Sequence, residues 1–201
     1  MKNAFLIGEK VYLRPLEKTD APVLQAYIND PDVIRTLDQH LPRSLHYEEA
    51  WLDGLGKDES IVAFGIALKK TDTLIGATDL RSINARARKA TFGISIGAKE
   101  EWNKGYGTEA TRLIVKYGFD TLNLNRIALH VYENNPKAIR AYEKVGFVRE
   151  GRYRQCVFRE GRYLDVICMA VLREEWEQQQ SKVEGRKSKA ETPEMDVLTE
   201  V

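Results

Sequence analysis

The chain has 201 residues, of which 43% are hydrophobic and 30% charged. This length and composition fit one globular domain with a sizeable core, and they exclude a disordered, collagen-like or membrane-spanning protein, because no apolar run approaches the roughly 18 residues that a spanning helix needs. Thirty-one basic and thirty acidic residues leave a net charge of +1, which does not favour a nucleic-acid or membrane partner.

The N-terminal residues and the two cysteines bear on the cellular compartment and on metal binding. The first ten residues carry charges and a glycine where a secretory signal would continue its apolar core, so we expect a cytoplasmic protein. Cys156 and Cys168 are too few for a disulfide framework, and neither lies in a metal-binding spacing. We therefore expect no metal site and interpret both cysteines as small buried side chains.

The first part of the chain alternates between strand and helix patterns. Residues 10–16 predict a strand, and an amphipathic helix follows from a cap at 19–20 to Ile28. A second helix begins at the cap residue Ser44 and ends at the glycines at 54 and 56. From Ser60 three strand-like segments joined by short turns predict an antiparallel meander: SIVAFGIALKK, LIGATDLRSI and ATFGISIG.

A crossover unit follows the meander. Apolar residues at helical spacing predict a helix over 106–121, and the segment 126–132 reads RIALHVY, which predicts a strand. A strand, a long helix and a strand in succession predict that strands 91–97 and 126–132 are parallel neighbours with a right-handed connection.

The last third begins with a short helix that is capped by Asn135-Pro136 and ends at Gly146. Residues 147–172 predict a hairpin that turns at Glu160-Gly161, and 174–180 predict a short helix. We place one domain over residues 1–180. Residues 181–201 have few large apolar side chains and many charges, which predicts a disordered tail.

The segment 102–110, WNKGYGTEA, joins a strand to the start of a helix. Gly105 and Gly107 let backbone N–H groups turn inward, and the helix N-terminus adds the positive end of its dipole. Such a loop favours a pyrophosphate ligand. A strand-to-helix turn without a ligand is the alternative, because paired glycines are common in loops.

The same loop satisfies the G-x-G-x-x-G/A pattern of dinucleotide-binding oxidoreductases, with Ala110 as its last residue. The spacing argues against that class. The gap between Ile96 and Gly105 is long, and the position about 20 residues after Gly105, where an acidic residue is needed, is Asn125. Only one crossover unit is predicted, and the phosphate-binding P-loop motif is absent from the sequence.

A second motif, Asn134-Asn135-Pro136, follows the strand at 126–132, and Asn135 precedes Tyr142 by two helical turns. With WNKGYGTEA and AYEKVGF, it resembles the GNAT superfamily of N-acetyltransferases, most closely the RimJ/RimL-like branch. The resemblance covers about residues 10–172. It implies an α/β fold with a mixed, mostly antiparallel sheet flanked by helices, whose central parallel strands splay to hold acetyl-CoA.

Cofactor contacts follow from the resemblance. It implies that the glycine loop holds the CoA pyrophosphate and that pantetheine pairs with the preceding strand. The implied cofactor-binding residues are Ile94, Ile96, Asn103, Lys104, Gly105, Tyr106, Gly107, Thr108 and Asn135. Two positions depart from the superfamily: Trp102 replaces a common Arg or Gln, a variation associated with the RimJ/RimL-like branch, and Thr91 replaces a common Glu.

Acetyl transfer to an amine needs a proton acceptor for the amine and a proton donor for the leaving thiolate. The acceptor is needed because an amine of pKa about 10.4 is almost fully protonated at pH 7. The resemblance puts Tyr142 beside the sulfur as the donor, with a packed core tyrosine as the alternative. His130 is a candidate base, although a lone strand histidine is more often structural. Glu133 and a bound water remain open.

The expected activity is direct transfer of acetyl from acetyl-CoA to a primary amine, which is a protein N-terminus, a polyamine or another small amine. A catalytically silent CoA-binding sensor or partner module is the alternative. The resemblance implies that residues 19–56 and the late hairpin choose the acceptor, but no motif there identifies it. His40 and His46 in that region are expected at the surface. The basic run at 149–162 predicts a solvated face. A homodimer is left open.

Overall fold

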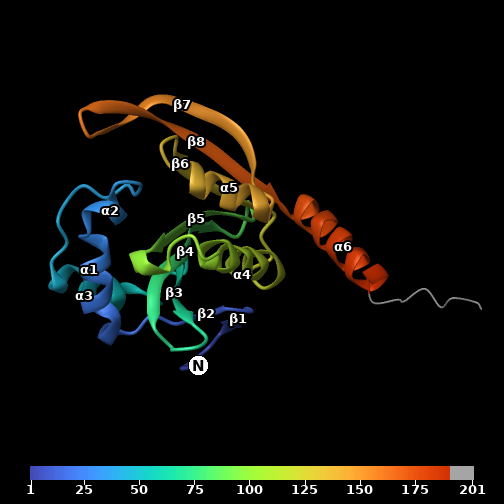
Figure 1. Ribbon diagram of the computed structural model, residues 1–201, viewed down its shortest axis with the longest axis horizontal. Coiled ribbons are helices and arrows are strands. Elements are labelled where there is room, and N and C mark those ends of the chain that lie inside the picture. The colour runs from blue at the N-terminus through green and yellow to red at the C-terminus, as the bar shows by residue number, and fades with distance from the viewer. Residues whose placement is uncertain (191–201) are drawn as a thin grey trace, which may run out of the picture.

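The computed structural model describes residues 1–190, which form one mixed eight-stranded sheet with helices on both faces (Figure 1). The strand order is β1-β2-β3-β4-β5-β6-β8-β7. The strands are β1 (Leu6–Ile7), β2 (Val11–Arg14), β3 (Val62–Leu68), β4 (Leu74–Asn84), β5 (Lys89–Ile96), β6 (Arg126–Tyr132), β7 (Val148–Arg159) and β8 (Arg162–Leu172). All neighbours are antiparallel except β5 and β6, which confirms the expected mixed sheet.

The helices are α1 (Ala21–Ile28), α2 (Pro31–Ile34), α3 (Leu45–Gly54), α4 (Tyr106–Asp120), α5 (Pro136–Val145) and α6 (Arg173–Ala190), with short 3-10 turns η1 (Lys18–Asp20) and η2 (Lys99–Glu101). Local signals explain their ends. The Ser44 side chain accepts the Tyr47 N–H at the start of α3, and Gly146, with φ of 113°, ends α5. The β5-α4-β6 crossover and the hairpin turn at Glu160-Gly161 are confirmed.

Three elements differ from the expectation. β1 has only two residues, too few for an alternating pattern to reveal it. α1 ends at Ile28 as expected, but a short helix that was not expected, α2, follows it, because the Asp30 side chain accepts the N–H groups of Asp32 and Val33. The helix expected to end at residue 180 continues as α6 to Ala190, since Glu, Gln, Lys and Arg favour helix without any core-facing period. Residues 191–201 of the expected tail lie outside the described residues.

The sheet separates two hydrophobic cores. α4 packs its buried face on the larger core, which includes Leu80 of β4 and Phe92 of β5. α1 and α3 pack on the opposite face of the sheet around Leu24, Leu52 and Ala77. Because side chains alternate along a strand, β4 supplies residues to both cores. This alternation determines which polar groups of β4 and β5 face α1 and α3.

The parallel strands separate soon after they meet. β5 pairs with β6 only over Lys89–Thr91 and Arg126–Ala128. Beyond this point β6 pairs with β8 alone, and residues 92–96 of β5 pair with β4 alone. The edge of β5 that faces β6 is therefore free of a strand partner over 92–96, which confirms the expected splay.

A buried ion pair fixes α1 to the sheet. Arg14 of β2 donates two hydrogen bonds of 2.8 Å to the carboxyl of Asp20, just before α1. Burial by itself would raise the pKa of Asp20, but the bonds from Arg14 and from the Glu17 amide outweigh burial and lower it. The folded state therefore gains stability from the ionised carboxylate.

We expect Asp20→Asn to lower the free energy of unfolding by about 3 kcal/mol at neutral pH, because the substitution leaves Arg14 charged and buried. The pKa of Asp20 is lowered in the folded state, so the difference in the free energy of unfolding between Asp20→Asn and wild type should shrink as the pH falls through that pKa. Urea unfolding at pH 7 and pH 3 measures it. Asp53→Asn is the control: it removes an exposed ion pair with Lys18 and should cost under about 1 kcal/mol. Equal losses in both variants would contradict the assignment.

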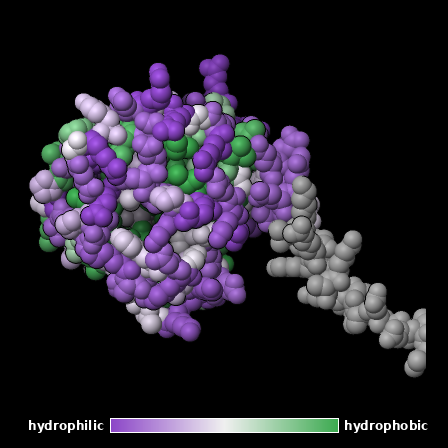
Figure 2. Space-filling view, turned by 45° about the horizontal axis from the view of Figure 1, so that its top comes forward, coloured by the Kyte–Doolittle hydropathy of each residue, from purple (hydrophilic) through white to green (hydrophobic). Residues whose placement is uncertain are grey.

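Figure 2 shows a mostly hydrophilic face with hydrophobic side chains in small groups. None of the helices within residues 1–190 is both long and apolar enough to cross a membrane.

Candidate active site

A cavity of about 1240 Å³ opens where β5 and β6 separate. Its lining comes from the free part of β5, the glycine loop, the end of β6, the start of α5 and the hairpin β7-β8. The volume exceeds the roughly 300–1,000 Å³ usual for small ligands, so the cavity has room for a long ligand together with a second one. The structure thus brings Tyr142, His130 and the glycine loop to one cavity.

The glycine loop adopts the conformation that an anion site needs. Gly105 has φ of 89° and Asn103 has φ of 64°, so both lie in the left-handed region. α4 begins at the next residue, and its first N–H groups lack acceptors within the helix. Gly105 is needed for its left-handed backbone, whereas Gly107 lies within α4 and has helical backbone. A Cβ at Gly107 would meet only Ile96 Cγ1, at 3.7 Å. The space above Gly107 is open for a ligand.

The free edge of β5 presents the polar groups of Ile94 and Ile96. Gly97 donates its N–H to Ile75 of β4, so by alternation Ile96 and Ile94 direct theirs to the other edge. Trp102 Nε1 donates to the Ile96 carbonyl at 2.7 Å. This bond ties the glycine loop to the end of β5, a structural role for the residue that departs from the superfamily pattern.

Two asparagines stand at the start of α5. Asn135 is the cap of that helix, since its Oδ1 accepts the Ala138 N–H at 3.2 Å, and its amide nitrogen is left to donate elsewhere. Asn134 also lines the cavity, and its buried Oδ1 has no hydrogen-bond partner among the described residues. A buried carbonyl oxygen without a partner is costly, so Asn134 is suited to accept an N–H from a ligand. Of the two asparagines, the sequence had pointed only to Asn135 as a cofactor-binding residue.

Tyr142 lies on the α5 side of the splay. Its ring meets Phe92 edge-on at 5.9 Å and Phe147 at 6.0 Å, so packing fixes the ring. Burial raises the pKa of Tyr142 to about 12. The hydroxyl therefore stays protonated at neutral pH and is suited to donate a hydrogen bond or proton into the cavity.

His130 and Asp79 flank the splay on the opposite face. Asp79 pairs in register with Gly93 of β5. The last parallel pair of β5 and β6 is Thr91 with Ala128, and two residues further along these strands come Gly93 and His130. Asp79 and His130 thus stand at the same level on either side of the gap, and both line the cavity. His130 is exposed, with its ring 5.7 Å from that of Tyr153.

Asp79 was missed by the sequence analysis. Its buried Oδ1 accepts no hydrogen bond from the described residues, and its nearest cation, Arg81, is 3.5 Å away. Burial raises the pKa of Asp79, and Arg81 only partly offsets that effect. A Cβ at position 93 would lie 2.9 Å from Asp79 Oδ2, so glycine there makes room for the carboxyl group. A charged residue inside an apolar strand was the available signal.

Glu133 and Lys104 lie outside the lining of the cavity. Glu133 is occupied, because its two oxygens accept bonds from the Asp165 N–H and from Arg152. Lys104 pairs with Glu101 at 2.9 Å. The interpretation of both cysteines as buried hydrophobes is wrong, because Cys168 is only half-buried and Cys156 is exposed. Cys156 lines the cavity on β7, which forms the edge of the sheet.

The remaining surface expectations also have outcomes. His40 and His46 are exposed, as expected. Two arginines of the basic run form surface ion pairs, Arg149 with Glu143 and Arg152 with Glu133. Within residues 1–190 no group of three or more His, Cys, Asp or Glu side chains is arranged to hold a metal ion.

This architecture matches a known family. A match to the acetyltransferase (GNAT) domain family spans residues 10–148. The chain belongs to the GNAT family. It is therefore an acetyl-CoA-dependent N-acetyltransferase. The splayed strand pair, the glycine loop and the asparagine cap all lie within the matched residues.

Curated GNAT relatives include proteins with and without an assigned acceptor. The uncharacterized N-acetyltransferase p20 of Bacillus licheniformis is 30% identical over 85% of this chain and 97% of its own length. The spermidine N(1)-acetyltransferase of Escherichia coli K12 is 31% identical over 84% of this chain and 89% of its own length.

Solved structures agree with the fold of this GNAT enzyme. Spermidine N-acetyltransferase from Vibrio cholerae in complex with CoA and spermine has a TM-score of 0.78 and 31% identity, covering 84% of this chain and 99% of that one. A dodecameric structure of the Vibrio cholerae enzyme has a TM-score of 0.73 and 31% identity, covering 84% of this chain and 97% of that one.

Proposed function

We propose that this enzyme transfers the acetyl group of acetyl-CoA directly to a primary amine, either a small amine such as a polyamine or a protein N-terminus. One observation carries the proposal: a single cavity has Tyr142 on one face of the splayed sheet and Asp79 and His130 on the other. Donor and acceptor can therefore approach the gap from opposite faces. Placement in the RimJ/RimL-like branch belongs to the same proposal and rests on Trp102.

The residues of the cavity fit acetyl-CoA. The N–H groups of the glycine loop and of the first turn of α4, residues 103–108, are suited to the pyrophosphate. The N–H groups of Ile94 and Ile96 lie on the free edge of β5 and are suited to an extended arm, whereas the Ile96 carbonyl already accepts from Trp102. Asn134 and Asn135 offer amide groups from the opposite wall. Acetyl-CoA supplies the activated acetyl group.

The proposed chemistry needs two proton transfers. The amine nitrogen uses its lone pair to form a C–N bond with the thioester carbonyl carbon, and the C–S bond breaks with its electrons going to sulfur. The nitrogen loses a proton to Asp79 or to His130, and the leaving sulfur receives a hydrogen bond or proton from Tyr142. Full transfer from a phenol of pKa about 12 to a thiolate of ordinary pKa would cost about 5 kcal/mol, so hydrogen bonding is the larger part of the contribution of Tyr142.

We expect Asp79→Asn to lower kcat/KM for the amine about tenfold at neutral pH, because asparagine keeps the shape but cannot accept the proton. Since burial raises the pKa of Asp79, wild-type kcat/KM should fall with decreasing pH at a higher pH than an ordinary aspartate would give. Asp79→Asn should lose that acidic limb. Asp72→Asn, at an exposed turn, is the control and should keep it. An unchanged pH profile in Asp79→Asn would remove this residue from the mechanism.

The proposed function is tested by measuring CoA release with a panel of amines: monoamines, diamines, polyamines and short peptides with free N-termini. Direct transfer predicts intersecting initial-velocity lines when both substrates are varied, whereas a route through Cys156 predicts parallel lines. Binding of CoA with no turnover of any amine would favour the silent CoA-binding module instead.

A further inference from the structure

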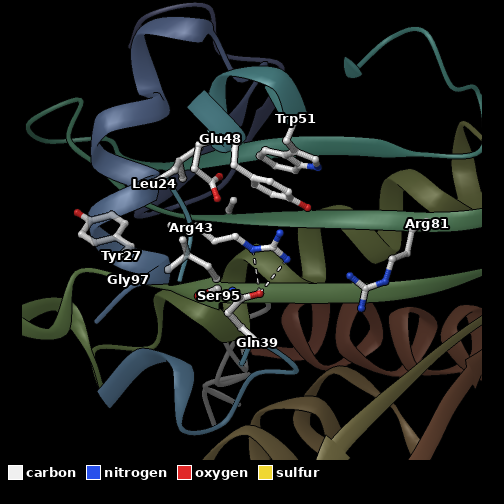
Figure 3. A pocket seen from close by; sticks show the side chains of 13 residues that line it. Leu24, Tyr27, Gln39, Arg43, Glu48, Trp51, Arg81, Ser95 and Gly97 are labelled. Atoms are coloured by element: carbon white, nitrogen blue, oxygen red, sulfur yellow. Dashed lines mark hydrogen bonds between the residues drawn. The ribbon is translucent and has the colours of Figure 1, made fainter. Parts of the chain in front are cut away.

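A second pocket, of about 290 Å³, lies between α1, α3 and the sheet (Figure 3). It adjoins the large cavity, because the two share five lining residues: Ile28, Gln39, Ala77, Arg81 and Ser95. Ala77 and Ser95 pair in register on the face of the sheet that also carries Asp79. The pocket is therefore an extension of the cavity on the side where the proposed acceptor enters.

Glu48 is a charged residue of this pocket, and its carboxyl group has no hydrogen-bond partner within residues 1–190. It is only 7% exposed, and in Figure 3 its carboxyl group points into the pocket from α3. Among the described residues its side chain has neither a hydrogen bond nor a cation within 4.0 Å. Burial raises the pKa of Glu48, and Arg43 partly offsets this. A buried carboxylate without a donor is costly, so its presence favours a ligand that supplies one.

The arginines at this pocket are already engaged. Arg43 donates to Gln39 Oε1 from Nε at 3.1 Å and from Nη2 at 2.9 Å, and its guanidinium lies 3.9 Å from the centre of the Tyr47 ring. Arg81 faces Asp79 at 3.5 Å. Both guanidinium groups thus have a partner, whereas no hydrogen-bond donor in the described part of the chain reaches the carboxyl group of Glu48, which favours a ligand that donates one, such as an ammonium group.

One part of the pocket wall is apolar. Leu24 and Tyr27 of α1 and Trp51 of α3 line the pocket beside the carboxyl group (Figure 3). Tyr27 is held by a bond from its hydroxyl to the Leu74 carbonyl at 3.0 Å. A Cβ at position 97 would lie 2.0 Å from Tyr27 Cγ, so glycine at that position lets the ring lie flat on the strand end. Such walls suit an alkyl chain.

We propose that this pocket binds the far end of the acceptor, with an alkyl stem against Trp51 and Leu24 and a second amino group at Glu48. The inference rests on the proposed function and deepens it, since it names the acceptor as a diamine or longer polyamine. Glu48 is a specificity-determining residue and takes no part in the bond changes. The reacting amino group lies at the other end of the acceptor, toward the splay.

The test compares 1,4-diaminobutane with butylamine, which has the same chain length and one amino group. Wild type should prefer the diamine in kcat/KM. Glu48→Gln should reduce the diamine-to-monoamine ratio of kcat/KM about tenfold or more, mainly through the KM of the diamine. Glu49→Gln, next on the same helix but outside the pocket lining, should leave the ratio unchanged. Calorimetry of 1,4-diaminobutane binding to the CoA-loaded enzyme gives a second readout without turnover.

The outcomes separate the two proposals. Turnover of both amines with no preference for the diamine, or an equal loss in both glutamate variants, would overturn the role of Glu48. A preference for acceptors that carry a carboxylate would overturn it in favour of the arginines. Diamine binding that depends on Glu48 without turnover would support the pocket and contradict the proposed function. Absence of both turnover and diamine binding would contradict both.

Discussion

Replacing Tyr142 with phenylalanine is expected to lower kcat for acetyl transfer about 100-fold, while the KM for acetyl-CoA changes only a few-fold. Phenylalanine keeps the ring contacts with Phe92 and Phe147, so the fold is preserved. What is lost is a hydroxyl that acts only as the C–S bond breaks. Because the pKa of Tyr142 is about 12, ionisation of this phenol should not reduce the wild-type rate between about pH 7 and pH 10.

Tyr117→Phe is the matched control, because Tyr117 packs against Phe5 and Phe64 outside the cavity. Its kcat should stay near the wild-type value. Steady-state kinetics and thermal unfolding of both variants distinguish the roles. If Tyr142 only packs the core, Tyr142→Phe would unfold at a lower temperature with a near-wild-type kcat, and Tyr142 would have no part in the mechanism.

The second large effect is expected from Gly107→Val, which should weaken CoA binding about 100-fold or more. The backbone at Gly107 is helical and a Cβ would meet only Ile96, so the protein should still fold. The branched side chain would occupy the open space above the first turn of α4, where the N–H groups of the glycine loop converge. Calorimetric titration with CoA measures the loss, and circular dichroism verifies the fold.

Gly54→Val is the control for a valine at a helical glycine, because no atom lies within 4 Å of a Cβ at the end of α3. It should bind CoA with wild-type affinity. Wild-type affinity in Gly107→Val as well would mean that the pyrophosphate lies elsewhere and that the glycine loop is only a turn.

Local signals made much of the fold predictable. Ser44 and Asn135 cap helices through their own side chains, and Gly146 ends α5 in the left-handed conformation. Each of these interactions spans three or four residues, so the sequence contains both partners. The crossover followed from the order of elements, since parallel neighbours need a long connection.

The acceptor side was not predictable in the same way. Asp79 stands out because its buried Oδ1 has no hydrogen-bond partner among the described residues, and Glu48 stands out because it is only 7% exposed. Burial depends on segments far away in the chain. Gly93 makes room for Asp79 only through the β4-β5 register, and Trp51 becomes a wall only when α3 packs on the sheet. The half of the site that carries the motifs can be predicted from the sequence, whereas the half that we propose selects the acceptor is assembled by tertiary packing.

The splay also affects how the enzyme avoids association. A strand edge without a partner is a template for pairing with another chain, and β5 exposes one in the middle of its sheet. The exposed stretch is short, five residues or about 16 Å, and it lies inside a cavity walled by α5 and the β7-β8 hairpin. Trp102 further occupies the Ile96 carbonyl at its end. The arrangement that we propose admits a slender ligand arm therefore also keeps out a foreign β-strand, so that one gap would serve both ligand recognition and protection against aggregation.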